Sequence, residues 1–194
     1  MNHFINWYAG LSTDDETVLI VQQKKNEHNS SWVAMLPSRW APMLPSVYGN
    51  TGLFKLNRFE RGRPSASKSN SDRCAVLILD DIGTKATPPP VAPTWRMETS
   101  PGNYQWGYAF AAGDQPLAAD FEAAVRALAR AGLTDEGACN AVRNWRLPGS
   151  KSLKDGPTGQ FEAVLVEFHP ERRFNLPDLM RTLGVEPDEP SASH

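Results

Sequence analysis

The sequence lacks a long apolar segment. No uninterrupted run of about 18 or more apolar residues occurs in its 194 residues, and a membrane-spanning helix needs a run of that length. Residues 1–10 also lack the basic start and following apolar run of a secretory signal peptide. Both absences predict a cytoplasmic protein without a membrane-spanning segment.

Cysteine and histidine are scarce as well. Cys74 and Cys139 lie far apart and form no CxxC pair, which argues against a disulfide framework and a zinc site. The four histidines are scattered along the chain. Unpaired cysteines are typical of a reducing compartment, so the cytoplasm is again the expected location.

Positive charge is not in excess. The chain has 20 basic and 22 acidic residues and a net charge of −2, which excludes a surface coated with positive charge for gripping duplex DNA. Two local basic segments remain, and each is read either as a solvated face or as a nucleic-acid contact. They contain Lys55, Arg58, Arg61, Arg63, Lys68 and Arg73, and Arg143, Arg146, Lys151 and Lys154.

Local patterns predict strands in the first half of the chain. The β-branched apolar residues of 17–23 indicate a strand, and 31–36 indicate another. Prolines and small residues predict a surface loop over 37–51, and glycine, proline and four serines predict a mobile loop over 60–73. The six apolar residues 74–79 predict a strand that is buried on both faces.

Helices follow in the second half. Residues 86–94 are expected to form an extended polyproline connector, and a hairpin with its turn at 100–103 is expected next. Periodic apolar residues and caps then predict two helices, a strand and a last helix. The predicted ranges are strands 95–99, 104–111 and 161–168, helices 116–131, 134–145 and 176–183, and a disordered tail over 186–194.

This order predicts an α+β domain with a mixed or antiparallel sheet, because strands and helices do not alternate regularly. We expect a single domain over residues 1–185, although the first fifty residues give weak signals.

The segment LDDIGTK, residues 79–85, is the first candidate site. It places Asp80 and Asp81 where a buried strand ends and Lys85 after a glycine turn. Mg²⁺ or Mn²⁺ prefers carboxylate oxygens held on a rigid element, and paired ions of this kind carry out phosphoryl transfer. The alternative is an ordinary polar turn that follows a core strand.

Two further segments carry polar groups. The turn in ETSPGNYQ, residues 98–105, presents backbone amides that can cradle a phosphate, or it is an ordinary hairpin turn. In the predicted helix 134–145 and its extension, Asp135 and Arg146 lie on one stripe, roughly 16 Å apart. Asp135 is then a third metal ligand, or an acid that favourably meets the helix dipole.

The order of these segments resembles the RepB-type primases of plasmids and phages, in the archaeo-eukaryotic primase (primase-polymerase) superfamily. The resemblance covers roughly residues 50–185. DDIGTK with ETSPGNYQ about fourteen residues later, and RLPGS, carry it most specifically, together with AVLVEFHPERRFNLPDLMRTLGV near the end.

The resemblance implies an RRM-like sheet packed with helices and a template-dependent nucleotidyltransferase that makes primers or extends DNA in a bacterial host cytoplasm. It implies two Mg²⁺ or Mn²⁺ ions on Asp80, Asp81 and Asp135, with NTPs or dNTPs as substrates. Nucleotide phosphates would be bound by Lys85, Ser100, Gly102, Asn103, Gln105, Arg146 and Lys154. A single-stranded DNA template would contact Arg61, Arg63, Lys68, Arg143 and Lys151.

Gln105 occupies the polar slot in which many superfamily members have histidine, as in this branch of the superfamily. The sequence departs from the family pattern at Ser152, where relatives often carry asparagine, and in a second respect that concerns its domains. The chain carries no helicase domain, so a replicative helicase or a helical bundle is expected in the same or another chain.

Two other functions fit the same residues. One is a non-catalytic replication-initiation or nucleotide-sensing module that binds single-stranded DNA through aromatics such as Trp95, Tyr104 or Trp106. The other is a different nucleotidyltransferase, for end joining or signalling, that would make a single adduct instead of a ladder of products.

Overall fold

The apolar run 74–79 lies in a strand that is buried on both faces, as predicted. In the computed structural model, which describes residues 2–25, 30–39, 46–151 and 161–189, Leu77 and Leu79 face one core and Val76 and Ile78 face another. Alternate side chains of a strand point to opposite faces, so an uninterrupted apolar run is what a strand between two cores requires.

The strands of the described residues form three antiparallel sheets, and each sheet is named here after one of its strands. The β7 sheet has the order β11 (Val164–Phe168), β8 (Trp95–Ser100), β9 (Asn103–Ala109) and β7 (Val76–Ile82). The β2 sheet has the order β10 (Asn144–Arg146), β4 (Val47–Asn50), β2 (Ile20–Lys25) and β3 (Ser30–Met35). The β5 sheet has the order β1 (Glu16–Thr17), β5 (Gly52–Lys55) and β6 (Ser71–Cys74).

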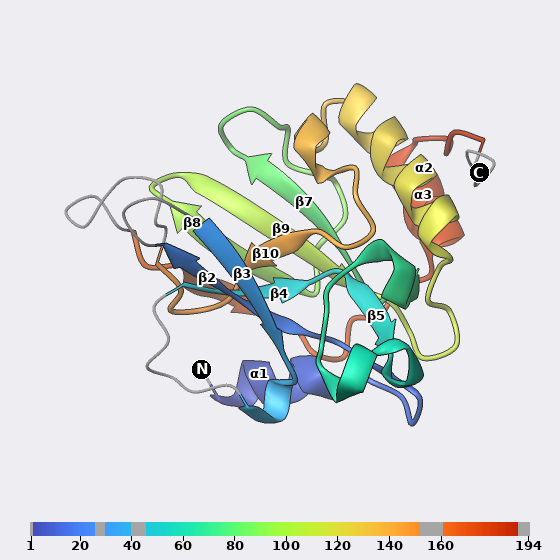
Figure 1. Cartoon of the computed structure of the whole chain (residues 1–194). Coiled ribbons are helices and arrows are strands. Elements are labelled where there is room, and N and C mark those ends of the chain that lie inside the picture. The colour runs from blue at the N-terminus through green and yellow to red at the C-terminus, as the bar shows by residue number, and fades with distance from the viewer. Residues whose placement is uncertain (1, 26–29, 40–45, 152–160, 190–194) are drawn as a thin grey trace.

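Helices cover the β7 sheet on one face, and the β2 sheet covers it on the other (Figure 1). Helices α2 (Ala118–Arg130) and α3 (Leu176–Leu183) share a core with Leu77 and Leu79. Helix α1 (Asn2–Ala9) and the β2 sheet share the other core with Val76 and Ile78. The α+β class with antiparallel sheets is therefore confirmed, and no helix within the described ranges is long and apolar enough to cross a membrane.

A tryptophan lies over a glycine in each of the two larger sheets. Trp95 faces Gly107 across β8 and β9, and Trp145 faces Gly49 across β10 and β4. A Cβ atom on Gly107 would lie 2.1 Å from the Trp95 ring, and one on Gly49 would lie 2.4 Å from the Trp145 ring. The two indoles, both fully buried, then contact each other with centroids 5.0 Å apart. The two sheets therefore pack through ring against ring at positions where only glycine leaves room.

The predicted helix 134–145 is wrong. A single 3₁₀ turn, η5 (Glu136–Ala138), is followed by strand β10. Gly137, Asn140 and Asn144 are poor helix formers, and burial of Trp145 against the neighbouring sheet outweighs the remaining helical preference. Asp135 and Arg146 therefore do not share a helical stripe.

Several elements were not predicted or have different bounds. Helix α1 and strands β4 and β5 were missed, and the predicted strand 17–23 is split between β1 and β2. The predicted loops contain 3₁₀ turns at η1 (Pro37–Arg39), η3 (Glu60–Gly62) and η4 (Lys68–Asn70), and a further 3₁₀ turn, η2 (Leu56–Arg58), lies between the two loops. The helix 116–131, the hairpin around 100–103 and the helix 176–183 are confirmed within two residues at either end.

Candidate active site

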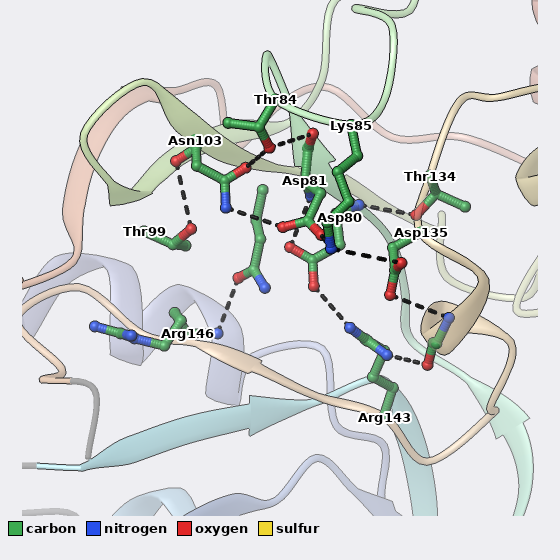
Figure 2. Close-up of polar contacts among 12 residues, drawn as sticks. Asp80, Asp81, Thr84, Lys85, Thr99, Asn103, Thr134, Asp135, Arg143 and Arg146 are labelled. Atoms are coloured by element: carbon green, nitrogen blue, oxygen red, sulfur yellow. Dashed lines mark hydrogen bonds and ion pairs between the residues drawn. The ribbon is translucent and has the colours of Figure 1, made fainter. Parts of the chain in front are cut away.

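A β-bulge turns Asp80 and Asp81 toward one polar cluster. Leu79 pairs with Trp106 and Ile82 pairs with Tyr104, so β7 takes three steps where β9 takes two. Asp81 absorbs the extra residue with a φ of 58°, a left-handed conformation that aspartate and asparagine tolerate better than most residues. Adjacent side chains of a regular strand point to opposite faces, whereas Figure 2 shows both carboxylates facing the same cluster.

The Asp81 carboxylate is held by two donors. Its Oδ1 accepts a hydrogen bond of 2.9 Å from Asn103 Nδ2, and its Oδ2 lies 2.7 Å from Lys85 Nζ. Thr84 Oγ1 donates to Asn103 Oδ1 at 2.9 Å and so fixes the orientation of the amide. Partial burial opposes ionisation of Asp81, but the hydrogen bonds from Lys85 and Asn103 outweigh burial and lower its pKa. Asp81 is therefore an oriented carboxylate at neutral pH.

The Asp80 carboxylate has a different partner. Its Oδ2 lies 2.7 Å from an Arg143 guanidinium nitrogen, and its Oδ1 accepts the Asp81 N–H at 2.9 Å. The Asp80 N–H donates to Thr134 Oγ1 at 2.9 Å. Arg143 also donates to the carbonyl of Gly137. Arg143 and Thr134 therefore fix Asp80 against the loop that follows α2.

Asp135 approaches the pair through Lys85. Its Oδ1 lies 4.0 Å from Lys85 Nζ, and its Oδ2 accepts the Gly137 N–H at 3.1 Å as the cap of η5. The Lys85 ammonium therefore lies between the carboxylates of Asp81 and Asp135 (Figure 2). The structure brings the three predicted acids into one neighbourhood although the helix that was expected to carry Asp135 does not form.

The hairpin turn contributes one side chain to this cluster. Asn103 reaches Asp81, whereas the Gly102 N–H donates to Glu98 Oε1 at 2.9 Å. Ser100 pairs with Asn103 across the turn. A Cβ atom on Gly83 would lie 2.8 Å from the carbonyl oxygen of Gly102, so glycine at that position lets the two turns touch.

Gln105 and Arg146 meet each other inside the protein. Gln105 Oε1 accepts the Arg146 N–H at 3.0 Å. The Arg146 guanidinium donates to Ser150 Oγ at 2.9 Å and to the carbonyls of Ser150 and Phe161 at 2.6 and 2.9 Å. Both side chains are buried, so their contacts join β9, β10 and the segment after β10. That they contact phosphates remains a prediction.

Lys151 is exposed, and its carbonyl accepts a hydrogen bond of 2.6 Å from Ser46 Oγ. The predicted phosphate contact Lys154 and the departure at Ser152 lie outside the described residues.

The basic residues of 55–73 lie away from the carboxylates. In Figure 1 this teal segment lies around and below β5, whereas Asp80 and Asp81 are among the last three residues of β7. Lys68 pairs with Glu122 at 2.6 Å, and Arg61 and Arg63 are exposed. Any DNA that these residues contact therefore lies at a distance from the candidate site.

Two threonines were missed by sequence reasoning. Thr84 orients Asn103, and Thr134 accepts the Asp80 N–H. Thr134 begins the predicted helix 134–145, where threonine is a common N-cap. Its role beside Asp80 depends on a contact across 54 residues of sequence, which no local pattern contains.

The chemistry of the donors fits a hard divalent cation. Asp80 and Asp81 offer carboxylate oxygens on a rigid strand, and cationic groups of the protein already lie on both of them. Lys85 is 70% exposed, so its side chain is free to turn toward solvent. Within the described ranges no three His, Cys, Asp or Glu side chains are arranged as a complete metal site, so the third ligand is not defined by this geometry.

Solved structures of other proteins have the same fold. The chain matches the crystal structure of primase RepB′ with a TM-score of 0.59 and 17% identity over 93% of its length, and it spans 60% of that protein. It matches the catalytic domain of RepB′ primase in complex with initiator DNA with the same TM-score and identity, over 94% of this chain and 92% of that domain. It also matches the AEP domain of the cyanophage S-2L primase-polymerase, with a TM-score of 0.61 and 13% identity, over 94% of this chain and 98% of that domain.

The protein therefore has the fold of an archaeo-eukaryotic primase catalytic core. More particularly, it has the fold of the RepB-type primases, as the sequence resemblance implied. No protein-family model and no curated protein sequence matches the chain, so the likeness is one of structure.

Proposed function

We propose that this protein is a template-dependent nucleotidyltransferase of DNA replication, which makes primers, extends DNA or does both. One observation carries the proposal: a bulge turns Asp80 and Asp81 to the same side, and Asp135 lies beside the lysine that pairs with Asp81. This arrangement lies on a fold whose solved examples are primases and a primase-polymerase.

Asp80 and Asp81 would hold Mg²⁺ or Mn²⁺, and Asp135 is the candidate third ligand. The bound ions would supply charge neutralisation for a triphosphate and activation of an attacking 3′-hydroxyl. Asn103 and Thr84 keep one Asp81 oxygen in place, and Thr134 keeps the backbone of Asp80 in place. Preorganised carboxylates of this kind lose little free energy to rearrangement when substrate binds.

Lys85 and Arg143 would bind the phosphates of the incoming nucleotide. Both already lie within 2.7 Å of a site carboxylate, and Lys85 extends into solvent. A lysine offers a compact point charge, whereas an arginine offers a planar fork that matches phosphate oxygens. Ser100 and Gly102 line the same turn as Asn103 and complete the proposed phosphate contacts.

The proposed template is single-stranded DNA. The support is the neighbouring RepB′ catalytic domain, whose structure holds initiator DNA. We propose that a replicative helicase or a helical-bundle domain, in the same or another chain, presents the template.

The Asp81→Asn variant tests the proposal. Asparagine accepts the left-handed backbone of position 81, so the fold is retained while the charge and metal affinity are lost. With Mn²⁺ or Mg²⁺, NTPs or dNTPs and a single-stranded template, we expect the wild-type protein to make a ladder of products on a sequencing gel. Asp81→Asn is expected to lower the rate by about 10³-fold or more.

Asp114→Asn is the matched control, because it removes one carboxylate from an exposed loop. It should retain the full rate. Wild-type activity in Asp81→Asn would exclude the assignment, and a single adduct in place of a ladder would indicate a nucleotidyltransferase without a template.

A non-catalytic binding module on the same fold is the second candidate. The observation in its favour is that Lys85 and Arg143 already neutralise Asp81 and Asp80 within the protein. In that case the protein binds nucleotide or single-stranded DNA with the same affinity in wild type and Asp81→Asn, and neither makes product.

A further inference from the structure

A groove lies between helix α2, helix α3 and the chain segment that follows α3. Its volume is about 750 Å³, and Figure 1 shows both helices on the same face of the β7 sheet. Ala123, Leu176 and Met180 are buried and form an apolar base. Leu117 lines the groove just before α2 and is 57% exposed, more than any other large apolar side chain among the described residues. An apolar surface of this kind marks an interaction site.

The rim of the groove is acidic. Asp114, Asp120 and Glu186 line it and are exposed, and they form no ion pair with any residue that the structure describes. Arg181, the basic residue among those that line the groove, is already paired with Asp178. The groove therefore combines an apolar base with negative charge that the protein itself does not neutralise.

The segment after α3, which forms one wall of the groove, is anchored at both ends. Gly184 ends α3 in the left-handed conformation with a φ of 69°, and the Val185 N–H donates to the carbonyl of Met180 at 3.1 Å. Asp188, another residue that lines the groove, pairs with Arg130 of α2. Because these contacts hold the wall in place, a partner that enters the groove loses little free energy to ordering it.

Helix α2 separates the groove from the candidate active site. The groove lies at the start of the helix, whereas the chain beyond its end reaches Asp80 through Thr134. The 13 residues of α2 span about 20 Å. A partner held in the groove would therefore leave the carboxylates of the candidate site accessible.

We propose that this groove binds an amphipathic helix of another protein, in which lysine or arginine flanks an apolar face. Apolar side chains at helical spacing would fill the base and cover Leu117, as in other helix-in-groove complexes. The basic side chains would meet Asp114, Asp120 and Glu186, because opposite charges across an interface select the partner. The inference goes beyond the proposed function, since none of the candidate catalytic residues takes part.

Charge favours this occupant over the others. Residues 190–194 of the chain, PSASH, contain no lysine or arginine that could neutralise the rim. A second copy related by a two-fold axis would bring two acidic rims together, and the same carboxylates would repel nucleic acid.

Fluorescence anisotropy tests the inference on the full chain, without metal or nucleotides. The probe is a labelled peptide of about eighteen residues, with leucine at the positions of one helical face and lysine at the others. We expect this peptide to bind, whereas a peptide with glutamate in place of lysine should bind about tenfold or more weakly. A peptide of the same composition in which leucine and lysine alternate should also bind more weakly, because its leucines do not share one face of a helix.

Leu117→Ser removes the exposed apolar side chain and keeps the helix. Leu117 is the N-cap residue of α2 and makes no capping hydrogen bond, and serine is a better N-cap than leucine. We expect about tenfold weaker binding of the lysine peptide, because a leucine that the peptide would cover is lost. Leu56→Ser removes a 41% exposed leucine outside the groove, and as the matched control it should bind like the wild type.

Glu186→Lys tests the charge of the rim. We expect it to weaken binding by about fivefold, and the difference from the wild type should shrink at about 0.5 M NaCl, where salt screens exposed charges. Glu60→Lys makes the same substitution at an exposed position outside the groove and should have a smaller effect.

Wild-type affinity in Leu117→Ser would overturn the inference, and so would equal affinity for the two lysine peptides. A dimer of the wild type that is lost in Leu117→Ser, seen by sedimentation velocity, would also overturn it by identifying the groove as a contact between copies. Synthesis separates this inference from the proposed function, because Leu117→Ser should make product at the wild-type rate. If the wild type makes product and Leu117→Ser binds the peptide normally, the inference alone is wrong. If the peptide binds as expected but the wild type makes no product, the proposed function alone is wrong.

Discussion

The two four-stranded sheets share a packing arrangement but carry opposite charge. In both sheets a buried tryptophan lies over the glycine directly across from it, and the two indoles meet between the sheets. The β7 sheet, however, contains Asp80, Asp81, Glu98 and Glu167, whereas the β2 sheet contains no acid among its described strands.

This difference shows how one core can support two surfaces. The Trp–Gly pairs fix the sheets in register, so residues at the strand ends and on the outer face are free to differ in charge. Acids gathered at a bulge suit cations, whereas the described strands of the β2 sheet contain no acid.

The largest expected loss of stability comes from disrupting the packing of tryptophan against glycine that the two sheets share. In Gly107→Ala the new Cβ would lie 2.1 Å from the Trp95 ring, so the indole must move in a full core. We expect a loss of about 3 kcal/mol in the free energy of unfolding, measured by urea denaturation. Gly49→Ala should cost a similar amount through Trp145 if the two sheets are equivalent.

Ala112→Val serves as the control for these glycine variants, since it adds carbon atoms at an exposed position. Its stability should stay within about 0.5 kcal/mol of the wild type. A Gly107→Ala protein as stable as the wild type would show that the sheets do not depend on close contact at the tryptophans.

A smaller loss of stability is expected when a hydrogen bond to the β2 sheet alone is removed. The buried Tyr8 hydroxyl donates to the carbonyl of Asn50 at 2.7 Å and accepts the Asn50 N–H at 2.9 Å, which ties α1 to β4. Tyr8→Phe leaves these buried backbone groups without a partner, so we expect a loss of about 1–3 kcal/mol. The measurement is thermal unfolding by circular dichroism.

Tyr104→Phe is the comparison in the β7 sheet, because the Tyr104 hydroxyl makes no hydrogen bond to any residue in the described ranges. Its melting temperature should stay close to that of the wild type. Equal losses in the two variants would contradict a specific role for the Tyr8 hydroxyl.

Local sequence patterns correctly predicted the elements whose own residues favour that structure. The run 74–79, the hairpin around 100–103 and the helix 116–131 have clear periodicity and turn residues, and the structure confirms them. Helix α1 was missed because its sequence, NHFINWYA, is rich in poor helix formers. Burial of Phe4 and Tyr8 against Trp145 stabilises it instead.

The candidate site was predictable in composition but not in geometry. DD after a buried strand indicated the acidic pair, and Asp135 was a candidate third ligand from its place in the predicted helix 134–145 and from the resemblance. The bulge that turns both acids to one side depends on the register with β9, and the wrongly predicted helix 134–145 hid the contacts of Thr134 and Arg143 with Asp80. Sequence patterns of period 2 or 3.6 contain no information about a bulge or about contacts between distant segments.

The smallest expected effect is a change in melting temperature that arises at the acidic site alone and depends on pH. Lys85 helps to lower the pKa of Asp81 in the folded protein, so the folded pKa lies below the unfolded value of about 3.9. Ionised Asp81 therefore stabilises the fold above pH 4, and this contribution is lost as the pH falls through the folded pKa. Lys85→Met should lower the melting temperature slightly at pH 7, by about 2 °C or less because the pair is solvent-screened.

As the pH falls below the folded pKa of Asp81, the carboxylate is protonated and the melting temperatures of the wild type and Lys85→Met should converge. Lys24→Met removes a lysine from the acid-free β2 sheet and should show no such convergence at acid pH. If the two lysine variants depended on pH in the same way, the acidic cluster would not distinguish one sheet from the other. A difference confined to Lys85→Met would instead show that the two surfaces are electrostatically independent although their strands share one core.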